Sequence, residues 1–283
     1  MEQEVLQIQL SCLNLEEINK IFKGDLATAS GVLSRISKQQ ELLGKISLGI
    51  LYENLSKQLK ETLNDRLGLS SSYYRLGRFS RMLDECDNEE FYHTQAYQIR
   101  LELLGPNNSL VARSLEKLGM LESSKNNHQG ALTYLKQAVS TYKSVEEKFK
   151  VAHTYICLSN LYSSQLNSDK AEHYARKALS IYQEYKSPRS PCFAKAFMCL
   201  SHVEYIRSNF EKSISYCLDS INILNRKYPM HPLTADAYFE LYEYHVNVTQ
   251  DYIQAKNLAE KIALILHNAF GHLPESFVCF LVN

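Results

Sequence analysis

The sequence predicts an all-α protein built from repeated helix pairs, and three observations support this fold class. The 283 residues contain 10 glycines and 6 prolines, about half of the usual share of these turn-forming residues. Apolar residues recur three and four positions apart, which is the spacing of one helix face. The same landmark residues also return every 40 to 42 positions, and a fixed period of this length is typical of repeat architectures.

Four landmarks define the repeat and keep their offsets through five units. The first landmark is a two-residue pair: Leu76-Gly77, Leu118-Gly119, Leu158-Ser159, Leu200-Ser201 and Tyr242-Glu243. A bulky residue lies three positions before each pair: Tyr73, Leu115, Tyr155, Phe197 and Phe239. Mostly small residues lie twelve positions after each pair, and again seven positions further on: Glu89, Ala131, Ala171, Ser213 and Ala255, then Ala96, Ala138, Ala178, Ser220 and Ile262. Such small residues indicate places where two helices approach closely.

Each unit is predicted to form two helices. In the third unit, Tyr155, Leu158 and Tyr162 share one face of the first helix, and Ala171, Tyr174 and Ala178 line the second. Asn88, Ser168 and Asp251 are the predicted N-caps of second helices. Gly, Pro and Asn mark the breaks between units, at residues 105–108, 187–191 and 229–232. Because one helix pair cannot bury its apolar face alone, we expect the five pairs to stack.

This pattern resembles the tetratricopeptide repeat (TPR), in which W-x2-L-G-x2-Y is followed by A-x3-F and then P. The third unit matches it at Tyr155, Leu158, Ser159, Tyr162, Ala171 and Ala178. The 42-residue period exceeds the usual period of about 34, and the loops at 103–109, 228–232 and 270–274 resemble those of kinesin light chains. The resemblance implies an α-α superhelix, the TPR solenoid, over residues 70–268. It also implies that first helices line the concave face and second helices the convex face.

The two ends of the chain do not keep the period. Residues 1–69 are predicted to form an irregular helical N-terminal cap with helices over 13–22, 25–37 and 42–63; the alternative is a decayed unit around Gly24, Asp25 and Ala29. Residues 269–283 are interpreted as the start of a truncated sixth helix pair. Their apolar residues Phe277, Val278, Phe280, Leu281 and Val282 are a candidate surface for self-association, unless this tail folds back on the last helix.

The charge and the cysteine content of the chain indicate which classes of partner and which cellular compartment to expect. The 31 Lys and Arg residues balance the 31 Asp and Glu residues, whereas a nucleic-acid-binding surface normally needs a basic excess. We expect no membrane contact, because no apolar stretch is long enough to span a bilayer and the N-terminus lacks the pattern of a signal peptide. The seven cysteines are odd in number and form no C-x-x-C motif, which favours reduced thiols and a cytoplasmic location.

The sequence carries no signature of catalysis, so we expect no enzyme activity, no cofactor and no metal. The strongest metal candidates are His153, Cys157, Cys199 and His202, which lie on predicted first helices of adjacent units. We favour the interpretation that Cys157 and Cys199 are core thiols, because each precedes a landmark leucine. The acidic run at residues 84–90 lacks the glycine and the spacing of a calcium loop.

The resemblance places a groove along the first helices, about half a turn away from the landmark pairs. The ten predicted groove residues are Tyr74, Arg78, Arg81, Arg113, Glu116, Asn160, Lys195, His202, Tyr205 and Tyr244. Four of them are cations, against the two carboxylates Glu116 and the neighbouring groove candidate Glu240. We therefore predict a groove that prefers acidic, partly apolar peptide segments. The alternative is that these charges are merely solvated.

The repeat, together with the lack of a reaction signature, predicts a non-catalytic scaffold or adaptor that binds segments of partner proteins. This expectation rests on analogy with other proteins of the fold. The alternative function is a regulatory or targeting module of a larger enzyme or assembly whose catalytic part lies elsewhere.

Overall fold

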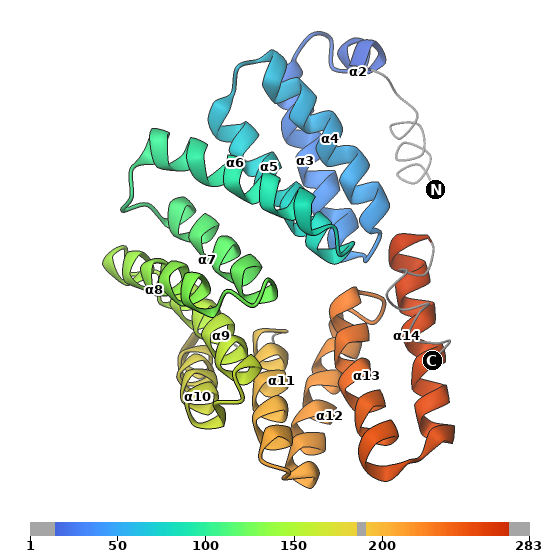
Figure 1. Cartoon of the computed structure of the whole chain (residues 1–283). Coiled ribbons are helices and arrows are strands. Elements are labelled where there is room, and N and C mark those ends of the chain that lie inside the picture. The colour runs from blue at the N-terminus through green and yellow to red at the C-terminus, as the bar shows by residue number, and fades with distance from the viewer. Residues whose placement is uncertain (1–14, 186–190, 272–283) are drawn as a thin grey trace. The chain divides into compact units, whose positions relative to one another are not determined.

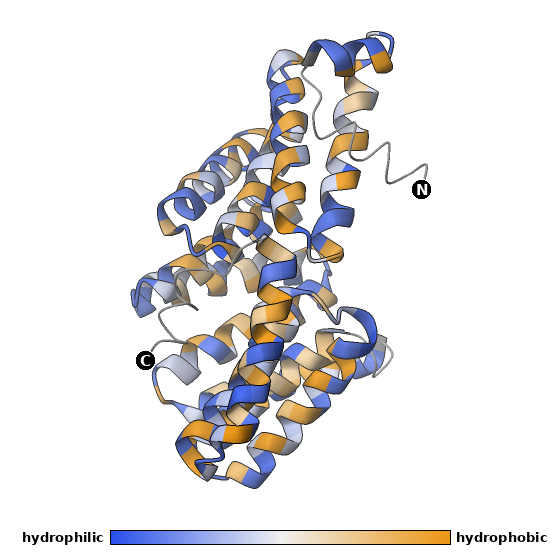
Figure 2. Ribbon diagram, turned by 90° about the vertical axis from the view of Figure 1, so that its right-hand side faces the viewer, coloured by the Kyte–Doolittle hydropathy of each residue, from blue (hydrophilic) through white to orange (hydrophobic). Residues whose placement is uncertain are grey.

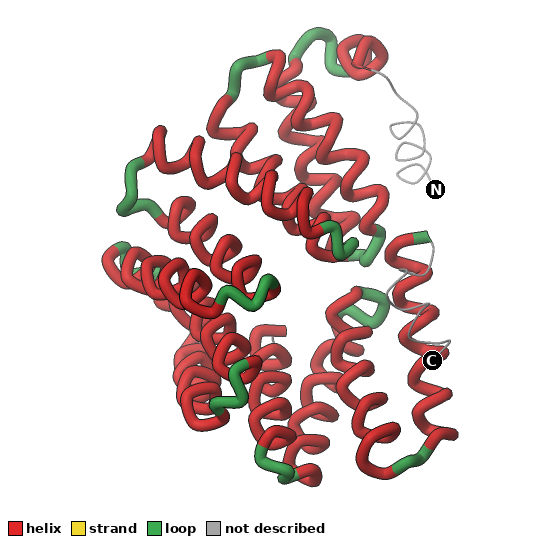
Figure 3. The backbone as a smooth tube through the Cα atoms, in the orientation of Figure 1, coloured by secondary structure: helices red, strands yellow, loops and turns green. Residues whose placement is uncertain are grey.

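A computed structural model describes residues 15–185 and 191–271, and every regular element within these ranges is helical (Figure 3). This confirms the predicted all-α class. In chain order the elements are α2 (Leu15–Ile21), α3 (Leu26–Leu42), α4 (Ile46–Thr62), α5 (Arg66–Met82), α6 (Cys86–Leu104), α7 (Ser109–Ser124), α8 (His128–Ser144), α9 (Lys148–Ser164), α10 (Ser168–Tyr185), α11 (Pro191–Ile206), α12 (Phe210–Lys227), α13 (Pro232–Tyr244), the π-helix η1 (His245–Thr249) and α14 (Tyr252–Phe270).

The helices belong to two compact units, each of which is described by itself. The first unit contains the described residues up to Leu103 together with Ala269–Gly271, and the second contains Leu104–Asn268. Figure 1 labels the helices of both units in chain order. The predicted boundary between residues 69 and 70 falls inside α5, which packs against α4 within the first unit. The predicted sixth helix start at 269–283 lies mostly outside the described residues.

The five predicted helix pairs are α5/α6, α7/α8, α9/α10, α11/α12 and α13/α14. In the first four pairs the two helices are joined by a turn of three residues, and the middle residue of each turn has a positive φ: Asp84 (61°), Asn126 (61°), Leu166 (55°) and Ser208 (62°). A left-handed residue ends one helix and reverses the chain direction. The following residue is then placed to cap the next helix.

This turn geometry explains which predicted N-caps are right. Asp251 is confirmed, because its Oδ1 accepts a hydrogen bond of 3.0 Å from the backbone N–H of Gln254. Ser168 is wrong by one residue: it begins α10, and Asn167 caps the helix by accepting from the N–H of Lys170 at 3.2 Å. Asn88 is also wrong, because it lies inside α6. In both cases the helix begins earlier than predicted, since the left-handed residues Leu166 and Asp84 close the turn sooner.

The small landmark residues lie where the two helices of a pair cross. The hydroxyl of Ser159 donates to the carbonyl oxygen of Ala171 at 2.8 Å. The hydroxyl of Ser201 likewise donates to the carbonyl oxygen of Ser213 at 2.9 Å. Gly77 and Gly119 occupy the equivalent positions, and a Cβ added at either glycine would lie less than 3.0 Å from a side chain of the second helix. The repeat therefore uses two solutions for a close crossing: a glycine in the first two pairs and a hydrogen-bonded serine in the next two.

The same crossing recurs in the N-terminal segment, which differs from the predicted irregular cap. The hydroxyl of Ser37 in α3 donates to the carbonyl oxygen of Gly49 in α4 at 2.8 Å, again twelve positions apart. Leu33 and Ser56 then occupy the other two landmark offsets, and both are buried. Helices α3 and α4 therefore form a further pair in register with the five predicted ones.

The core of the second unit combines small residues of the second helices with aromatic residues of the first. Ala131, Ala138, Ala171 and Ala178 are 0% exposed. Tyr155 and Tyr162 of α9 both pack on Tyr174 of α10, with ring centroids 5.6 Å apart in each case. Figure 2 shows apolar and polar residues on the same helices. Among the described helices, none combines the length and the apolarity needed to cross a membrane.

Candidate functional site

The three predicted groove residues of the first unit lie on α5, and all three interact with other residues of that unit. Tyr74 is 6% exposed and packs under the guanidinium of Arg100, 4.9 Å from its ring centroid. Arg78 forms an ion pair with Glu41 of α3. Arg81 forms one with Glu89 of α6 at 3.2 Å. The positive charge expected on this part of the groove is therefore largely neutralised by neighbouring carboxylates.

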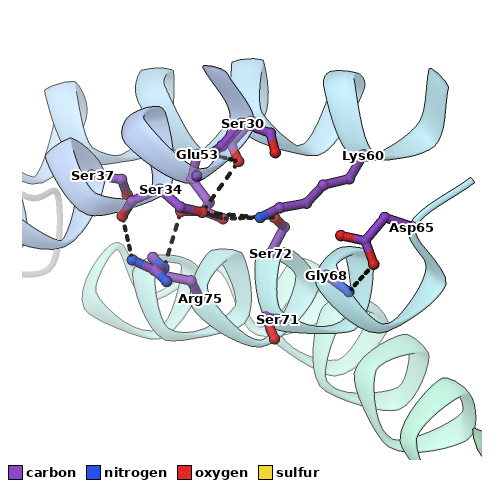
Figure 4. A network of polar contacts seen from close by, with 12 residues as sticks. Ser30, Ser34, Ser37, Glu53, Lys60, Asp65, Gly68, Ser71, Ser72 and Arg75 are labelled. Carbon is purple, nitrogen blue, oxygen red and sulfur yellow. Dashed lines mark hydrogen bonds and ion pairs between the residues drawn. The ribbon is translucent and has the colours of Figure 1, made fainter. Parts of the chain in front are cut away.

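A buried polar network explains why α5 is so polar. Glu53 of α4 is 0% exposed, and its carboxylate lies 3.0 Å from Nε of Arg75 and 3.8 Å from Nζ of Lys60. Lys60 also donates to the hydroxyls of Ser34 and Ser72, at 3.0 and 2.8 Å. Figure 4 shows these groups converging between α3, α4 and α5. Burial, assisted by the charge of Arg75, lowers the pKa of Lys60 even though Glu53 opposes the shift. This network links three helices and leaves little of its charge for a ligand.

In the second unit, the first helices of successive pairs lie next to one another, since α7 contacts α9 and α9 contacts α11. This face carries the other seven predicted groove residues, in different environments. Glu116 is buried at 4% exposure, whereas Asn160 and His202 are exposed. Arg113, Lys195, Tyr205 and Tyr244 are partly buried. The oxygen Oδ1 of Asn160 accepts a hydrogen bond from the thiol of Cys199 at 3.0 Å, so one face of this amide is already occupied.

Three of the predicted residues meet in one pocket. His202 and Tyr205 of α11 and Tyr244 of α13 line a small cavity of about 30 Å³, large enough for water or the end of one side chain. The remaining lining residues are Ser201, Ser213, Ile214, Cys217, Glu240, Leu241 and Glu243. Ser213, Ile214 and Cys217 come from the second helix α12, which was assigned to the opposite face. Their contribution depends on how α12 packs between α11 and α13, and the repeat pattern carries no signal for it.

Aromatic rings and a helix irregularity border this pocket. Phe210 of α12 lies between Tyr205 and Tyr244, with ring centroids 5.6 and 6.5 Å away. Directly after Tyr244 the chain changes from α-helix to the π-helix η1. π-helical turns are uncommon and occur frequently at functional sites. The pocket is therefore both chemically distinctive and placed at the one described departure from α-helical geometry.

The pocket is acidic in composition, but one of its carboxyl groups retains its proton at neutral pH. Burial, together with the nearby carboxylates of Asp236 and Glu243, raises the pKa of Glu240 to about 8, and hydrogen bonding from Ser201 opposes the shift. Desolvation of the imidazole by the surrounding residues also lowers the pKa of His202, against the influence of Glu243. Both groups are thus mostly neutral near pH 7. A cation entering the pocket would favour the ionised form of Glu240.

We expect Glu240 to make the free energy of unfolding fall as pH rises from about 5 to 8. In this window the native carboxyl keeps its proton while the unfolded one loses it, so rising pH favours the unfolded state, by at most about 1.4 kcal/mol per pH unit. Glu240→Gln should remove this slope. Urea unfolding across the pH range measures it, with Glu260→Gln at an exposed position of α14, outside the pocket, as the control. Equal slopes in wild type and Glu240→Gln would contradict the assignment.

A second cluster lies further along the same face, between α7 and α9. Nδ1 of His153 lies 3.0 Å from Oε1 of Glu116, and the thiol of Cys157 is close to both groups. Burial works to raise the pKa of Glu116, but His153, Lys117 and Thr154 outweigh it and hold the pKa at about 2. The sequence pattern assigns Glu116 to the peptide groove, and it indicates His153 and Cys157 as metal candidates without Glu116. The packing of α7 on α9 brings the three together.

The repeated helix pairs with small residues at their crossings define a helical repeat protein. The tetratricopeptide repeat family model matches residues 68–144, and a second tetratricopeptide repeat model matches residues 151–185. These ranges correspond to α5–α8 and α9–α10. The chain thus carries tetratricopeptide repeats over these residues, and they are similar to those of kinesin light chains.

One sequence relative and two solved structures are similar to this chain. Protein KINESIN LIGHT CHAIN-RELATED 1 of Arabidopsis thaliana is 24% identical over 214 residues, which are 72% of this chain and 34% of that protein. The chain thus spans about a third of the length of this curated relative. BtubC (BKLC) from P. vanneervenii has a similar fold, with a TM-score of 0.59 at 19% identity over 78% of this chain and 90% of that chain. The Rap conjugation gene regulator of plasmid pLS20, solved in complex with the Phr* peptide, has a TM-score of 0.70 at 16% identity over 87% of this chain and 64% of that chain.

Proposed function

We propose that this protein is a non-catalytic scaffold or adaptor whose second unit binds a peptide segment of a partner protein along α7, α9, α11 and α13. The observation that carries the proposal is the pocket formed by His202, Tyr205 and Tyr244, because it lies on the face where the tetratricopeptide repeat resemblance places a ligand. Binding of a peptide by a protein of similar fold, the pLS20 regulator, supports the same view. The seam between α11 and α13 then serves as the anchor point for one side chain.

The chemistry of the pocket favours a basic side chain at this anchor. Glu243 supplies a carboxylate, and Glu240 supplies a carboxyl group that a bound cation would ionise. Tyr205 and Tyr244 supply aromatic faces that attract cations. The acidic preference predicted from the sequence is weakened, because Arg78 and Arg81 are paired within the first unit. We therefore propose a segment with Lys or Arg at the pocket.

Selection from a library of short peptides on the full-length chain tests this proposal. We expect selected peptides to share a Lys or Arg, and replacing that residue by norleucine or Glu should lower affinity about tenfold, as expected for loss of a desolvated cation–aromatic contact. Tyr244→Ala should lower affinity by a similar factor. Tyr252→Ala, at a tyrosine of α14 that is 65% exposed, is the control. Binders without a shared basic residue, or binding that is unaffected by Tyr244→Ala, would contradict the proposal.

Compartment and partners are part of the same proposal. The described cysteines Cys86, Cys157, Cys192, Cys199 and Cys217 are free thiols, which supports a reducing compartment such as the cytoplasm. The balanced charge of the chain supports protein partners over nucleic acid. Self-association through residues 277–282 remains a prediction, because these residues lie outside the described part of the chain.

The alternative function is that of a regulatory or targeting module within a larger assembly. It is favoured by the comparison with the Arabidopsis relative, of which the chain covers 34%. Affinity capture from native extract distinguishes the two functions. A module of an assembly should co-purify in fixed stoichiometry with the same subunits after charge reversal at Glu240 and Glu243, whereas a peptide-binding adaptor should lose its partners.

A further inference from the structure

Helices α7 and α9 hold three metal-ligating side chains against one another. One ligand atom from each of Glu116, His153 and Cys157 lies within 4.8 Å of the other two. His153 and Cys157 are four positions apart and so share one face of α9, while Glu116 reaches them from α7. We propose that Glu116, His153 and Cys157 bind a Zn²⁺ ion between the first helices of two neighbouring repeats.

The donor set and its spacing suit zinc. Zinc binds imidazole nitrogen, thiolate sulfur and carboxylate oxygen, with tetrahedral geometry and metal–ligand distances of about 2.0 to 2.3 Å. Ideal tetrahedral angles place a nitrogen and an oxygen ligand about 3.3 Å apart. The distance between Nδ1 of His153 and Oε1 of Glu116 is 3.0 Å, so these atoms need to separate by only a few tenths of an ångström. The thiol of Cys157 moves inwards to complete the three ligands.

The surrounding polar groups hold the carboxylate in place. The hydroxyl of Thr154 donates to Oε2 of Glu116 at 2.7 Å, which leaves Oε1 directed at His153. Such second contacts orient metal ligands in known sites. Lys117 approaches Oε1 only to 3.9 Å and donates instead to the sulfur of Met120 at 3.4 Å. The carboxylate oxygen is therefore not occupied by a lysine hydrogen bond.

Charge and access are also compatible with an ion. Zinc binding deprotonates a coordinating thiol, and the charges of that thiolate and of Glu116 then balance the two charges of the ion. Glu116 and Cys157 are 4% and 7% exposed, whereas the side chain of His153 is 31% exposed. The ion can therefore enter along His153 and keep its fourth position open to water. Bound in this way, it would clamp α7 to α9.

Titration of the metal-free full-length chain with Co²⁺, followed by displacement with Zn²⁺, tests the site. We expect one tightly bound equivalent with a thiolate-to-cobalt absorption band. Cys157→Ser should abolish the band, and His153→Ala should weaken binding at least tenfold. The control variants are Cys86→Ser and Cys217→Ser, which change an exposed and a buried thiol outside the cluster. Each should retain the absorption band and the affinity for the metal.

Because His153 is partly exposed, His153→Ala is expected to fold, which circular dichroism verifies and which keeps the test valid if a buried variant unfolds. A band that persists in Cys157→Ser, or an affinity unchanged in His153→Ala, would overturn the site. Binding without any thiolate band would mean that only a surface metal is present, and would overturn it equally. Peptide binding at the α11–α13 pocket is measured separately, so failure of this inference leaves the proposed function standing.

Discussion

Glu53→Gln is expected to lower the free energy of unfolding of the first unit by about 3 kcal/mol, because breaking a buried ion pair leaves its partner uncompensated. Glu53 is 0% exposed and faces Arg75 at 3.0 Å and Lys60 at 3.8 Å. Glutamine has nearly the same shape, so the loss reports charge rather than packing. Urea unfolding of the full-length chain, followed by hydrogen exchange at the amides of α3 to α5, measures it.

The matched control for this substitution is Glu102→Gln. Glu102 pairs with Arg66 at 2.6 Å, but both side chains are at least half exposed, and exposed pairs contribute little. We expect the control to change stability by less than about 1 kcal/mol. Losing Glu53 also removes the charge that opposes the lowered pKa of Lys60. The variant should therefore regain stability as pH rises towards the ordinary pKa of lysine, since native Lys60 then loses its proton before the unfolded chain does.

Gly77→Ala is expected to destabilise the first unit by about 2 kcal/mol, because it overpacks the crossing of α5 and α6. A Cβ at this position would lie 2.7 Å from Cε1 and 2.8 Å from Nδ1 of His93. The imidazole ring is rigid and 0% exposed, so it cannot move aside cheaply. Helix propensity alone predicts the opposite sign, since Ala is favoured over Gly by about 1 kcal/mol inside a helix. Chemical denaturation decides between the two effects.

Gly31→Ala in α3 is the control for this crossing. A Cβ at Gly31 meets no atom within 4 Å, so propensity acts alone and we expect a gain of up to about 1 kcal/mol. The two alanine substitutions should thus change stability in opposite directions within one unit. A higher free energy of unfolding for both variants would show that a methyl group at Gly77 does not disturb the crossing of α5 and α6.

Much of the fold could be predicted because the responsible signals are local. Landmarks such as Leu76-Gly77 and Ala96 mark helix faces and close crossings, and both depend on residues only a few positions apart along the chain. The pair α3/α4 also carries these landmarks, at Leu33, Ser37 and Gly49, but unusual residue types hid the period. The N-caps of α6 and α10 were misplaced because a left-handed turn residue such as Leu166 has no distinctive sequence pattern.

The candidate site was predictable only in part. The helical phase of α11 and α13 indicated that His202, Tyr205 and Tyr244 belong to one face, and these residues do line one pocket. The same phase gave no information about ion pairs between helices. Arg78 meets Glu41, which is 37 positions away in the sequence.

The amino-acid sequence alone determined the helix spacing, the repeat period and the small residues at the helix crossings. Each of these features depends on neighbours within one helical turn or one helix pair. The packing of helices against one another determined the contacts between residues that are distant in the sequence. It buried Glu116 beside His153, neutralised the arginines of α5 and placed α12 residues in the pocket. A charge is either compensated or available to a ligand depending on which helix lies beside it, and that is a property of the folded chain.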